Sequence, residues 1–182
     1  MQDEATDDDR LMARVAGGDR AAYAALVELH LDRVLAVAQR VLGSRSDAED
    51  VAQEVFLRVW TRAAEWRPGR ARLSTWLYRV TVNLCIDRQR RRPAHRGIEE
   101  AEELPDPAAA AEETLAARQR QRRVEQAVAE LPERQRSAVA LCYTAGLSNA
   151  AAAEALDVSV GALESLLVRA KRTLRARLAG LD

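Results

Sequence analysis

The sequence contains few glycine, proline, cysteine and aromatic residues, and this composition disfavours whole classes of structure. Its 182 residues include 8 Gly, 5 Pro and 2 Cys, and aromatic residues make up 4% of the chain. Sheet proteins favour aromatic and β-branched residues, whereas alanine and leucine, which are abundant here, favour helices. The chain is long enough to bury one medium core or two small cores. The composition therefore predicts an all-α protein.

Metal, disulfide and membrane chemistry have no support in the sequence. Cys85 and Cys142 lie far apart among apolar residues, and no Cys-x-x-Cys or Cys/His ligand spacing surrounds them. His30 and His95 are isolated as well. We therefore expect buried, reduced thiols, no metal and no cofactor. We find no signal peptide and no apolar run long enough to cross a membrane, so we expect a cytoplasmic protein.

The formal net charge is zero, but the charges are segregated along the chain. Residues 1–9 carry five acids, and residues 98–117 carry seven acids and no base. Residues 10–97 hold 17 bases against 9 acids, and residues 118–182 hold 11 against 7. All of these bases except Lys171 are arginines, whose planar fork suits phosphate and guanine. Two basic blocks of this kind indicate nucleic-acid binding, with ordinary solvated charge as the alternative.

Hydrophobic periodicity and capping signals predict the helices of the first half. We expect a disordered acidic tail over residues 1–9, then a short helix and a long helix that Gly43 closes. Ser46 and Glu49 have the spacing of a capping box for the next helix. That helix carries apolar residues, the last of them Trp60, on one side and polar residues on the other.

The following helix and the linker are bounded by proline and by composition. Ser74 or Thr75 can cap a helix that runs to about Arg92, where Pro93 stops it. Residues 93–117, rich in Ala, Glu, Asp and Pro, predict a flexible linker whose Ala-rich part can be partly helical.

The last segment has the pattern of a helix-turn-helix. Pro132 marks the first position of one helix, and Gly146 ends it. A short Ala-rich helix capped by Ser148 then leads through the turn at Asp157 into a second helix capped by Ser159. A plain helical hairpin is the alternative. The second helix has an apolar stripe formed by Leu163, Leu167, Ala170, Leu174 and Leu178.

Four segments, taken in order, resemble one family. They are DAEDVAQEVFLRVW (47–60), STWLYRVTVNLCIDRQRRR (74–92), LPERQRSAVALCYTAGLS (131–148) and SVGALESLLVRAKRTLRARL (159–178). Together they are similar to the extracytoplasmic-function (group IV) sigma factors of the sigma-70 superfamily, which direct RNA polymerase to alternative promoters. The resemblance implies two small helical domains joined by the flexible acidic linker.

The resemblance also implies domain boundaries and partners. The acidic tail (1–9) would precede region 2 (10–92), which recognises and helps to melt the −10 element. The linker (93–117) would lead to region 4 (118–182), which binds the −35 element as duplex. The expected partners are the β′ and β subunits of core RNA polymerase, promoter DNA and an anti-sigma factor, in a stress or environmental response.

Three sets of residues follow from the resemblance. An acidic helix face would meet a basic coiled coil on β′: Asp47, Asp50, Gln53 and Glu54. The −10 element would meet Arg72, Trp76, Tyr78, Arg79, Asn83, Asp87, Arg88, Arg90 and Arg91. The −35 element would meet Ser159, Gly161, Ala162, Glu164, Ser165, Arg169, Lys171 and Arg172.

Within the −10 set the residues have different expected roles. Asn83 and the loop before Ser74 would form a pocket for an extruded base, because an amide both donates and accepts. The arginines would hold phosphates, and Asp87 would orient one of them. For Trp76 and Tyr78 the alternative is a place in the core.

The chain departs from the family pattern at several positions in the helix-turn-helix. Ala151 stands where an acidic residue often completes a capping box, and Asp157 stands where the turn often has glycine. Glu164 and Leu166 occupy positions that are often basic or polar. Glu164 cannot bind phosphate but can accept from a cytosine amino group, and Leu166 can widen the buried stripe.

Other classes of protein explain fewer of these features. A conventional helix-turn-helix regulator would leave the acidic face of residues 47–60 and the segment 74–92 without a purpose. An enzyme would need a triad, a phosphate loop or a carboxylate pair in a recognisable context, and we find none in the sequence. A purely structural helical adaptor would not need an arginine cluster beside aromatic residues.

Overall fold

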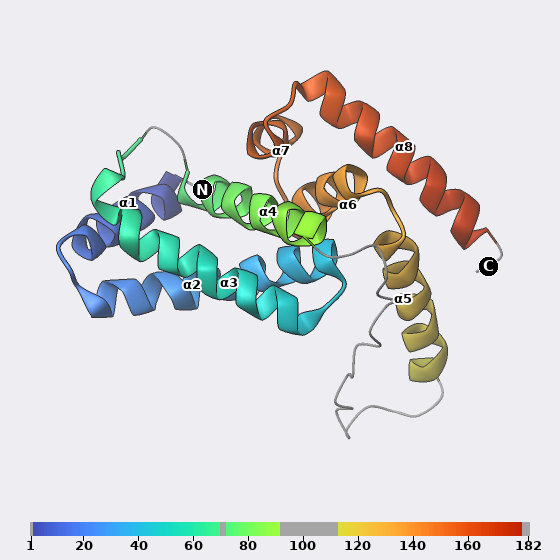
Figure 1. The fold of residues 1–182 in the computed structure, drawn as a ribbon, viewed down its shortest axis with the longest axis horizontal. Helices are drawn as coiled ribbons and strands as arrows, with labels where there is room; N and C mark the ends of the chain where they lie inside the picture. The colour runs from blue at the N-terminus through green and yellow to red at the C-terminus, as the bar shows by residue number, and fades with distance from the viewer. Residues whose placement is uncertain (1, 70–71, 92–112, 180–182) are drawn as a thin grey trace.

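The structure is a computed structural model, and it describes residues 2–69, 72–91 and 113–179. Within these ranges every regular element is helical (Figure 1). None of the described helices is both long enough and apolar enough to span a membrane. The elements are α1 (Gln2–Ala16), α2 (Arg20–Leu42), α3 (Arg45–Arg62), η1 (Ala63–Glu65), α4 (Leu73–Arg91), α5 (Glu113–Ala129), α6 (Glu133–Val139), η2 (Ala140–Thr144), α7 (Asn149–Leu156) and α8 (Val160–Leu178).

Helix α1 includes most of the segment that we expected to be a disordered acidic tail, so that expectation is wrong. Asp8 is buried, and its Oδ1 lies 2.9 Å from Nε2 of His30, 22 residues away. Asp9 accepts a hydrogen bond of 2.8 Å from the indole N–H of Trp66, 57 residues away. His30 lies on α2 and Trp66 just after η1, and a local reading of an acidic run cannot detect such distant partners.

The caps of α2 and α3 agree with the predictions in part. Gly43 ends α2 with a left-handed backbone (φ 68°), as expected, because glycine has no Cβ to oppose it. The cap of α3 is Ser44 rather than Ser46, so the predicted capping box is wrong by two residues. The Ser44 hydroxyl accepts from the backbone N–H of Asp47 at 3.4 Å and lies 3.2 Å from the Ser46 hydroxyl.

Helix α4 begins slightly earlier than its predicted caps. Its first residue is Leu73, and the backbone N–H of Trp76 already donates to the carbonyl of Arg72 at 3.1 Å. Ser74 and Thr75 are therefore inside the first turn and do not cap the helix. The helix ends at Arg91, close to the predicted end, while Pro93 lies outside the described residues.

The helix boundaries in the second half lie close to the predicted ones, with small shifts. Helix α5 begins at Glu113, five residues inside the expected linker, whose earlier part lies outside the described residues. Pro132 is the residue just before α6 rather than its first residue. After a π-helical turn, η2, the chain leaves the helix at Gly146 (φ 70°), as predicted.

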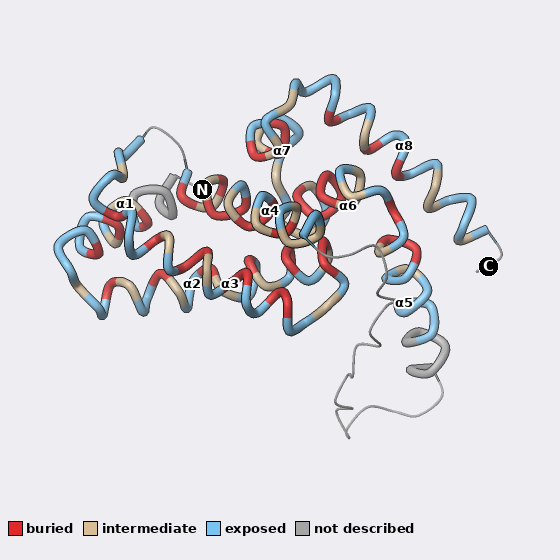
Figure 2. The backbone as a smooth tube through the Cα atoms, viewed as in Figure 1, coloured by how far each residue is buried: buried red, intermediate tan, exposed pale blue. Residues whose placement is uncertain are grey.

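The two halves of the chain pack against each other. In the first half α2 packs on α3 and α4, and α1 covers one end. In the second half α8 packs on α5, α6 and α7. Helix α7 lies beside α4, while α5, α6 and η2 lie against α2 (Figure 1). Buried residues line the facing sides of these helices, and the outer side of α8 is exposed (Figure 2).

Both cysteines are free, as the sequence predicted. Cys85 is fully buried on α4, and this burial raises the pKa of its thiol from 9.0 to about 12. Cys142 is only partly buried, and burial raises the pKa of its thiol as well. Arg136 of α6 is close enough to Cys85 for its charge to oppose the shift, which places the second half of the chain next to α4.

Candidate nucleic-acid and protein interfaces

One face of α4 carries most of the residues that the resemblance assigned to the −10 element. They recur at spacings of three or four residues, so they form a single stripe along the helix. The side chains are exposed, apart from a half-buried tryptophan. The stripe consists of Arg72, just before the first residue of α4, and of Trp76, Arg79, Asn83, Asp87 and Arg90 on the helix. It combines cations, an amide and an aromatic ring, which are the groups that single-stranded nucleic acid needs.

Tyr78 does not belong to this stripe. It follows Trp76 by two residues, which turns its side chain about 200° around the helix at 3.6 residues per turn. It is 2% exposed, and burial raises its pKa against the opposing effect of Arg33. This burial favours the alternative, a place for Tyr78 in the core, over contact with DNA. Arg91, by contrast, is exposed at the end of α4.

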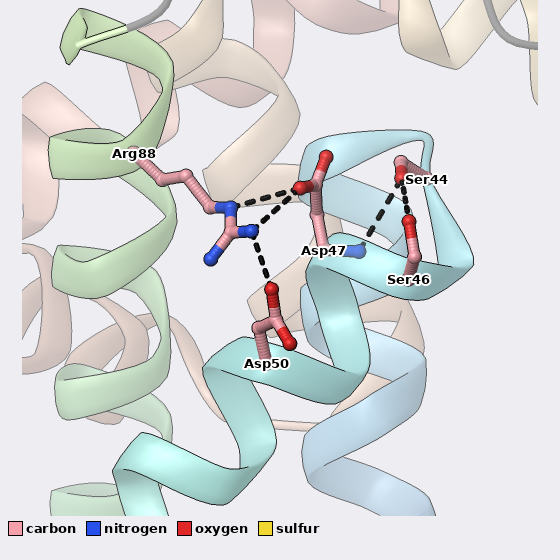
Figure 3. Close-up of polar contacts among 5 residues, drawn as sticks. All are labelled: Ser44, Ser46, Asp47, Asp50 and Arg88. Carbon is pink, nitrogen blue, oxygen red and sulfur yellow. Dashed lines mark hydrogen bonds and ion pairs between the residues drawn. The ribbon is translucent and has the colours of Figure 1, made fainter.

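Arg88 also lies off the stripe, because it follows Asp87 by one residue, about 100° around the helix. Two carboxylates of α3 hold it there (Figure 3). Its Nε donates to Oδ1 of Asp47 at 2.9 Å, its Nη2 lies 2.8 Å from the same oxygen, and Nη2 donates to Oδ2 of Asp50 at 2.6 Å. Asp47 is 5% exposed, whereas the Asp50 side chain is 57% exposed. An arginine of α4 is thus oriented by α3, a role that the sequence had assigned to Asp87.

The remaining acidic face of α3 is open to solvent. Gln53 is exposed, and Glu54 accepts from Nε of Arg58 at 3.1 Å. Leu57 shares this face and is 53% exposed, which the sequence analysis did not single out although it follows Gln53 by four residues. Trp60, predicted on the apolar side, lies at its edge with 36% of its surface exposed.

A hollow of about 420 Å³ opens beside the start of α4. Its walls include two tryptophans, Trp66 and Trp76, whose rings meet edge to face at 6.4 Å between centroids. Arg62, Arg67 and Arg79 bring three cations to the same walls. Trp66 was not among the predicted residues, although a tryptophan directly before an Arg-Pro-Gly break was the available signal. Two of the lining residues, Trp66 and Arg67, come shortly before the predicted loop that precedes Ser74 in the sequence.

The helix-turn-helix has the predicted geometry. Ser148 caps α7 by accepting from the backbone N–H of Ala151, and Ser159 caps α8 by accepting from that of Ala162, both at 3.2 Å. Asp157 adopts the left-handed conformation (φ 54°), as its position in the turn requires. Of the predicted stripe of α8, Leu163, Leu167 and Ala170 are buried, and Leu174 and Leu178 are partly buried.

Every residue predicted to contact the −35 element is exposed on α8 or at its cap. Five of them line one shallow hollow together with a valine that the sequence analysis missed, and Leu166 packs on the core instead. The residues of this hollow are Gly161, Glu164, Ser165, Val168, Arg169 and Arg172. Lys171 points elsewhere, with its Nζ 5.6 Å from the ring centre of Tyr143. Asn149 of α7 donates to Glu164 at 3.5 Å.

The two halves match two family models. The model described as Sigma-70 region 2 matches residues 26–94, and the model described as Sigma-70, region 4 matches residues 121–174. The ECF RNA polymerase sigma factor SigM of Mycobacterium tuberculosis is 35% identical over 179 residues, which cover 97% of this chain and 86% of SigM. SigW of Bacillus subtilis is 28% identical over 178 residues, which cover 92% of this chain and 95% of SigW.

Solved structures of similar fold contain partner proteins. CnrH in complex with the cytosolic domain of CnrY has a TM-score of 0.72 at 27% identity, and the match covers 95% of this chain and 97% of CnrH. The sigma factor RpoE of Bartonella quintana, in complex with the anti-sigma factor NepR, has a TM-score of 0.70 at 21% identity. That match covers 87% of this chain and 97% of RpoE, and it shows a shared fold.

Proposed function

The chain belongs to the extracytoplasmic-function sigma factors, and from this premise we propose that α3 binds core RNA polymerase while α4 and α8 bind the −10 and −35 elements. A sigma factor is a transcription initiation factor and not an enzyme, so these surfaces serve binding and strand separation. The boundaries that we propose are 10–92 for region 2 and 118–182 for region 4, with residues 113–117 already helical.

The polymerase-binding surface that we propose is the exposed part of α3. Asp50, Gln53 and Glu54 present acceptors toward solvent, which suits a basic coiled coil on the β′ subunit. Asp47 is too buried to lie in a flat interface, and its proposed role is to hold Arg88 and thereby to shape the Asp50 side of the surface.

The −10 surface that we propose is the stripe of α4 together with the tryptophan-lined hollow. Arginines along the stripe hold phosphates, which makes binding sensitive to salt, while Asn83 reads the edge of an extruded base. The single observation that carries this assignment is the exposure of Asn83 between arginines on one continuous face.

The −35 surface that we propose is the exposed face at the start of α8. A helix that follows a short turn and leaves its first turns open fits the major groove. Glu164 lies in that face and can accept from a cytosine amino group, whereas Arg169 and Arg172 contact the backbone. Lys171, whose ammonium lies over the ring of Tyr143, adds a positive charge to region 4.

Regulation by an anti-sigma protein follows from the similar structures. CnrH and RpoE were solved with CnrY and with the anti-sigma factor NepR, and their folds match nearly the whole of this chain. We infer that an anti-sigma protein controls this chain in a stress or environmental response. Because the chain works with RNA polymerase, its proposed location is the cytoplasm.

Transcription by sigma-free core polymerase on a promoter library tests the function. We expect new start sites with shared upstream elements only when this protein is added. Asn83→Ala should impair melting or −10 selectivity more than core binding, and equal loss of core binding would remove Asn83 from the reading set. Glu164→Arg should change the −35 preference. Duplex binding without new starts would favour a conventional regulator.

A further inference from the structure

Trp66 forms part of the wall of the tryptophan-lined hollow, although it lies just beyond the end of a helix. It follows η1 with an extended backbone (φ −61°, ψ 134°) and directly precedes Arg67 and Pro68. The other aromatic side chain of the wall, Trp76, is on α4, where the helical hydrogen bonds fix the backbone. The shape of the hollow therefore depends on what holds the ring of Trp66 in place.

Asp9 of α1 holds this ring. Its Oδ1 accepts a hydrogen bond of 2.8 Å from the indole N–H of Trp66, across 57 residues of sequence. A donor must point at its acceptor, so the N–H edge of the indole faces α1 and is not available to a ligand. The ring meets that of Trp76 edge to face, with 75° between the ring planes, which is a favoured geometry. Trp66 therefore offers the hollow a surface for stacking and no hydrogen-bond donor.

Asp9 can fix the indole because α1 is itself anchored to the first half of the chain. The neighbouring residue, Asp8, pairs with His30 of α2 at 2.9 Å, and both side chains are less than 10% exposed. Helix α1 also packs on η1, the turn that precedes Trp66. Of the described residues of α1, Met12 lines the hollow and Asp9 does not. Asp9 thus acts on the hollow through Trp66.

We propose that Asp9 is a positioning residue of the −10 site: it holds the indole of Trp66 as a preformed stacking surface for a base in the hollow. The inference rests on the proposed function of α4 and the hollow, and it adds α1 to the elements that determine −10 recognition. A ring that is already fixed loses little conformational entropy when a base stacks on it. Without the carboxylate the ring is free to change rotamer, and binding must first immobilise it.

The test uses holoenzyme assembled from core polymerase and the full chain. The probe is a fluorescent single strand that carries the −10 element of a promoter from the library experiment. Asp9→Ala should lower the affinity for this strand about twofold to tenfold, the cost of immobilising one side chain. Asp7→Ala is the matched control, because Asp7 is an acid of the same helix that is 65% exposed and pairs with Arg10. Both variants lose one negative charge, so a fall confined to Asp9→Ala has another cause.

A cycle with Trp66→Phe shows whether Asp9 acts through the indole. Phenylalanine keeps an aromatic ring but has no N–H, so Asp9→Ala should have no further effect on strand affinity in this background. Asp9→Asn keeps an acceptor oxygen and should retain most of the wild-type affinity. An equal effect of Asp9→Ala in both backgrounds would mean that Asp9 only stabilises α1, and it would overturn the positioning role.

Nuclear magnetic resonance of the free chain measures the contact without DNA. The indole N–H signal of Trp66 is identified by its loss in Trp66→Phe. In Asp9→Ala this signal should move upfield and exchange faster with solvent, and in Asp7→Ala it should stay where it is. An unchanged signal in Asp9→Ala would also overturn the proposal. Circular dichroism establishes that each variant is folded.

Failure of the positioning role and failure of the proposed function are distinguishable. If the wild type directs initiation and binds the strand, but Asp9→Ala binds it as tightly as Asp7→Ala, the positioning role alone is wrong. If the wild type neither binds core polymerase nor directs initiation, the proposed function fails, and the role of Asp9 falls with it.

Discussion

The link between α3 and α4 predicts that two neighbouring carboxylates contribute very differently to stability. Arg88 contacts both Asp47 and Asp50, at 2.8 Å and 2.6 Å, so distance alone would rank Asp50 first. Solvent exposure reverses that order, because the Asp47 side chain is 8% exposed and that of Asp50 is 57% exposed. Water screens an exposed pair far more than a buried one.

The expected coupling energies follow from this difference. For Arg88 and Asp47, a charge-assisted pair with one buried partner, we expect about 2 kcal/mol. For Arg88 and Asp50 we expect about 0.5 kcal/mol or less, as for other exposed pairs. At 2–4 °C per kcal/mol for a chain of this size, breaking the first contact lowers the melting temperature by roughly 4–8 °C.

Double-mutant cycles, with unfolding in urea, measure these two coupling energies. The variants are Asp47→Asn, Asp50→Asn and Arg88→Met, alone and in the two pairs, with unfolding followed by circular dichroism. The cycle removes what Asp47 contributes through its other contacts. A coupling of Arg88 to Asp50 that equals or exceeds its coupling to Asp47 would refute the reasoning from burial. If Asp50→Asn is stable as expected, any loss of polymerase binding in that variant reports on the interface itself.

Three further predictions concern single residues. The pKa of Cys85 is about 12 in the folded chain and 9.0 ordinarily, so the thiol of the unfolded chain loses its proton first as the pH rises. The free energy of unfolding should therefore fall between pH 9 and 12, by about 4 kcal/mol at the upper end. Urea titrations should show a smaller fall in Cys85→Ala, and an equal dependence on pH in both proteins would contradict the assignment. Asp157→Gly should stabilise the chain by about 1 kcal/mol, since glycine adopts φ 54° without strain, and a melting temperature that stays constant or falls would argue against strain at this turn. Asp8→Ala should cost about 1–3 kcal/mol because it leaves His30 buried without its carboxylate; a cost below that of the exposed control Asp7→Ala would show that the buried pair is not stabilising.

The helices and most of their caps were predictable from the sequence because the signals are local. Gly43, Ser148 and Ser159 sit at helix ends, and each acts on backbone groups within four residues. The exposed stripe through Asn83 and the buried stripe through Leu163 also follow from helical spacing alone. The family resemblance, carried by segments from both halves, was correct for the same reason: its motifs are short and ordered along the chain.

The tertiary structure decided what each polar residue does. Asp47 and Arg88 are 41 residues apart, and Asp9 and Trp66 are 57 apart, so only packing brings them together. Tyr78 is two residues from Trp76 and yet lies in the core, because α4 has helices on several sides and buries more than one face. Glu154 of α7 lines the same hollow as Trp66 and Trp76 because α7 packs against α4, and no local pattern carries that information. Local sequence determines backbone conformation and caps, whereas burial and charge pairing depend on contacts between segments that are distant in the chain.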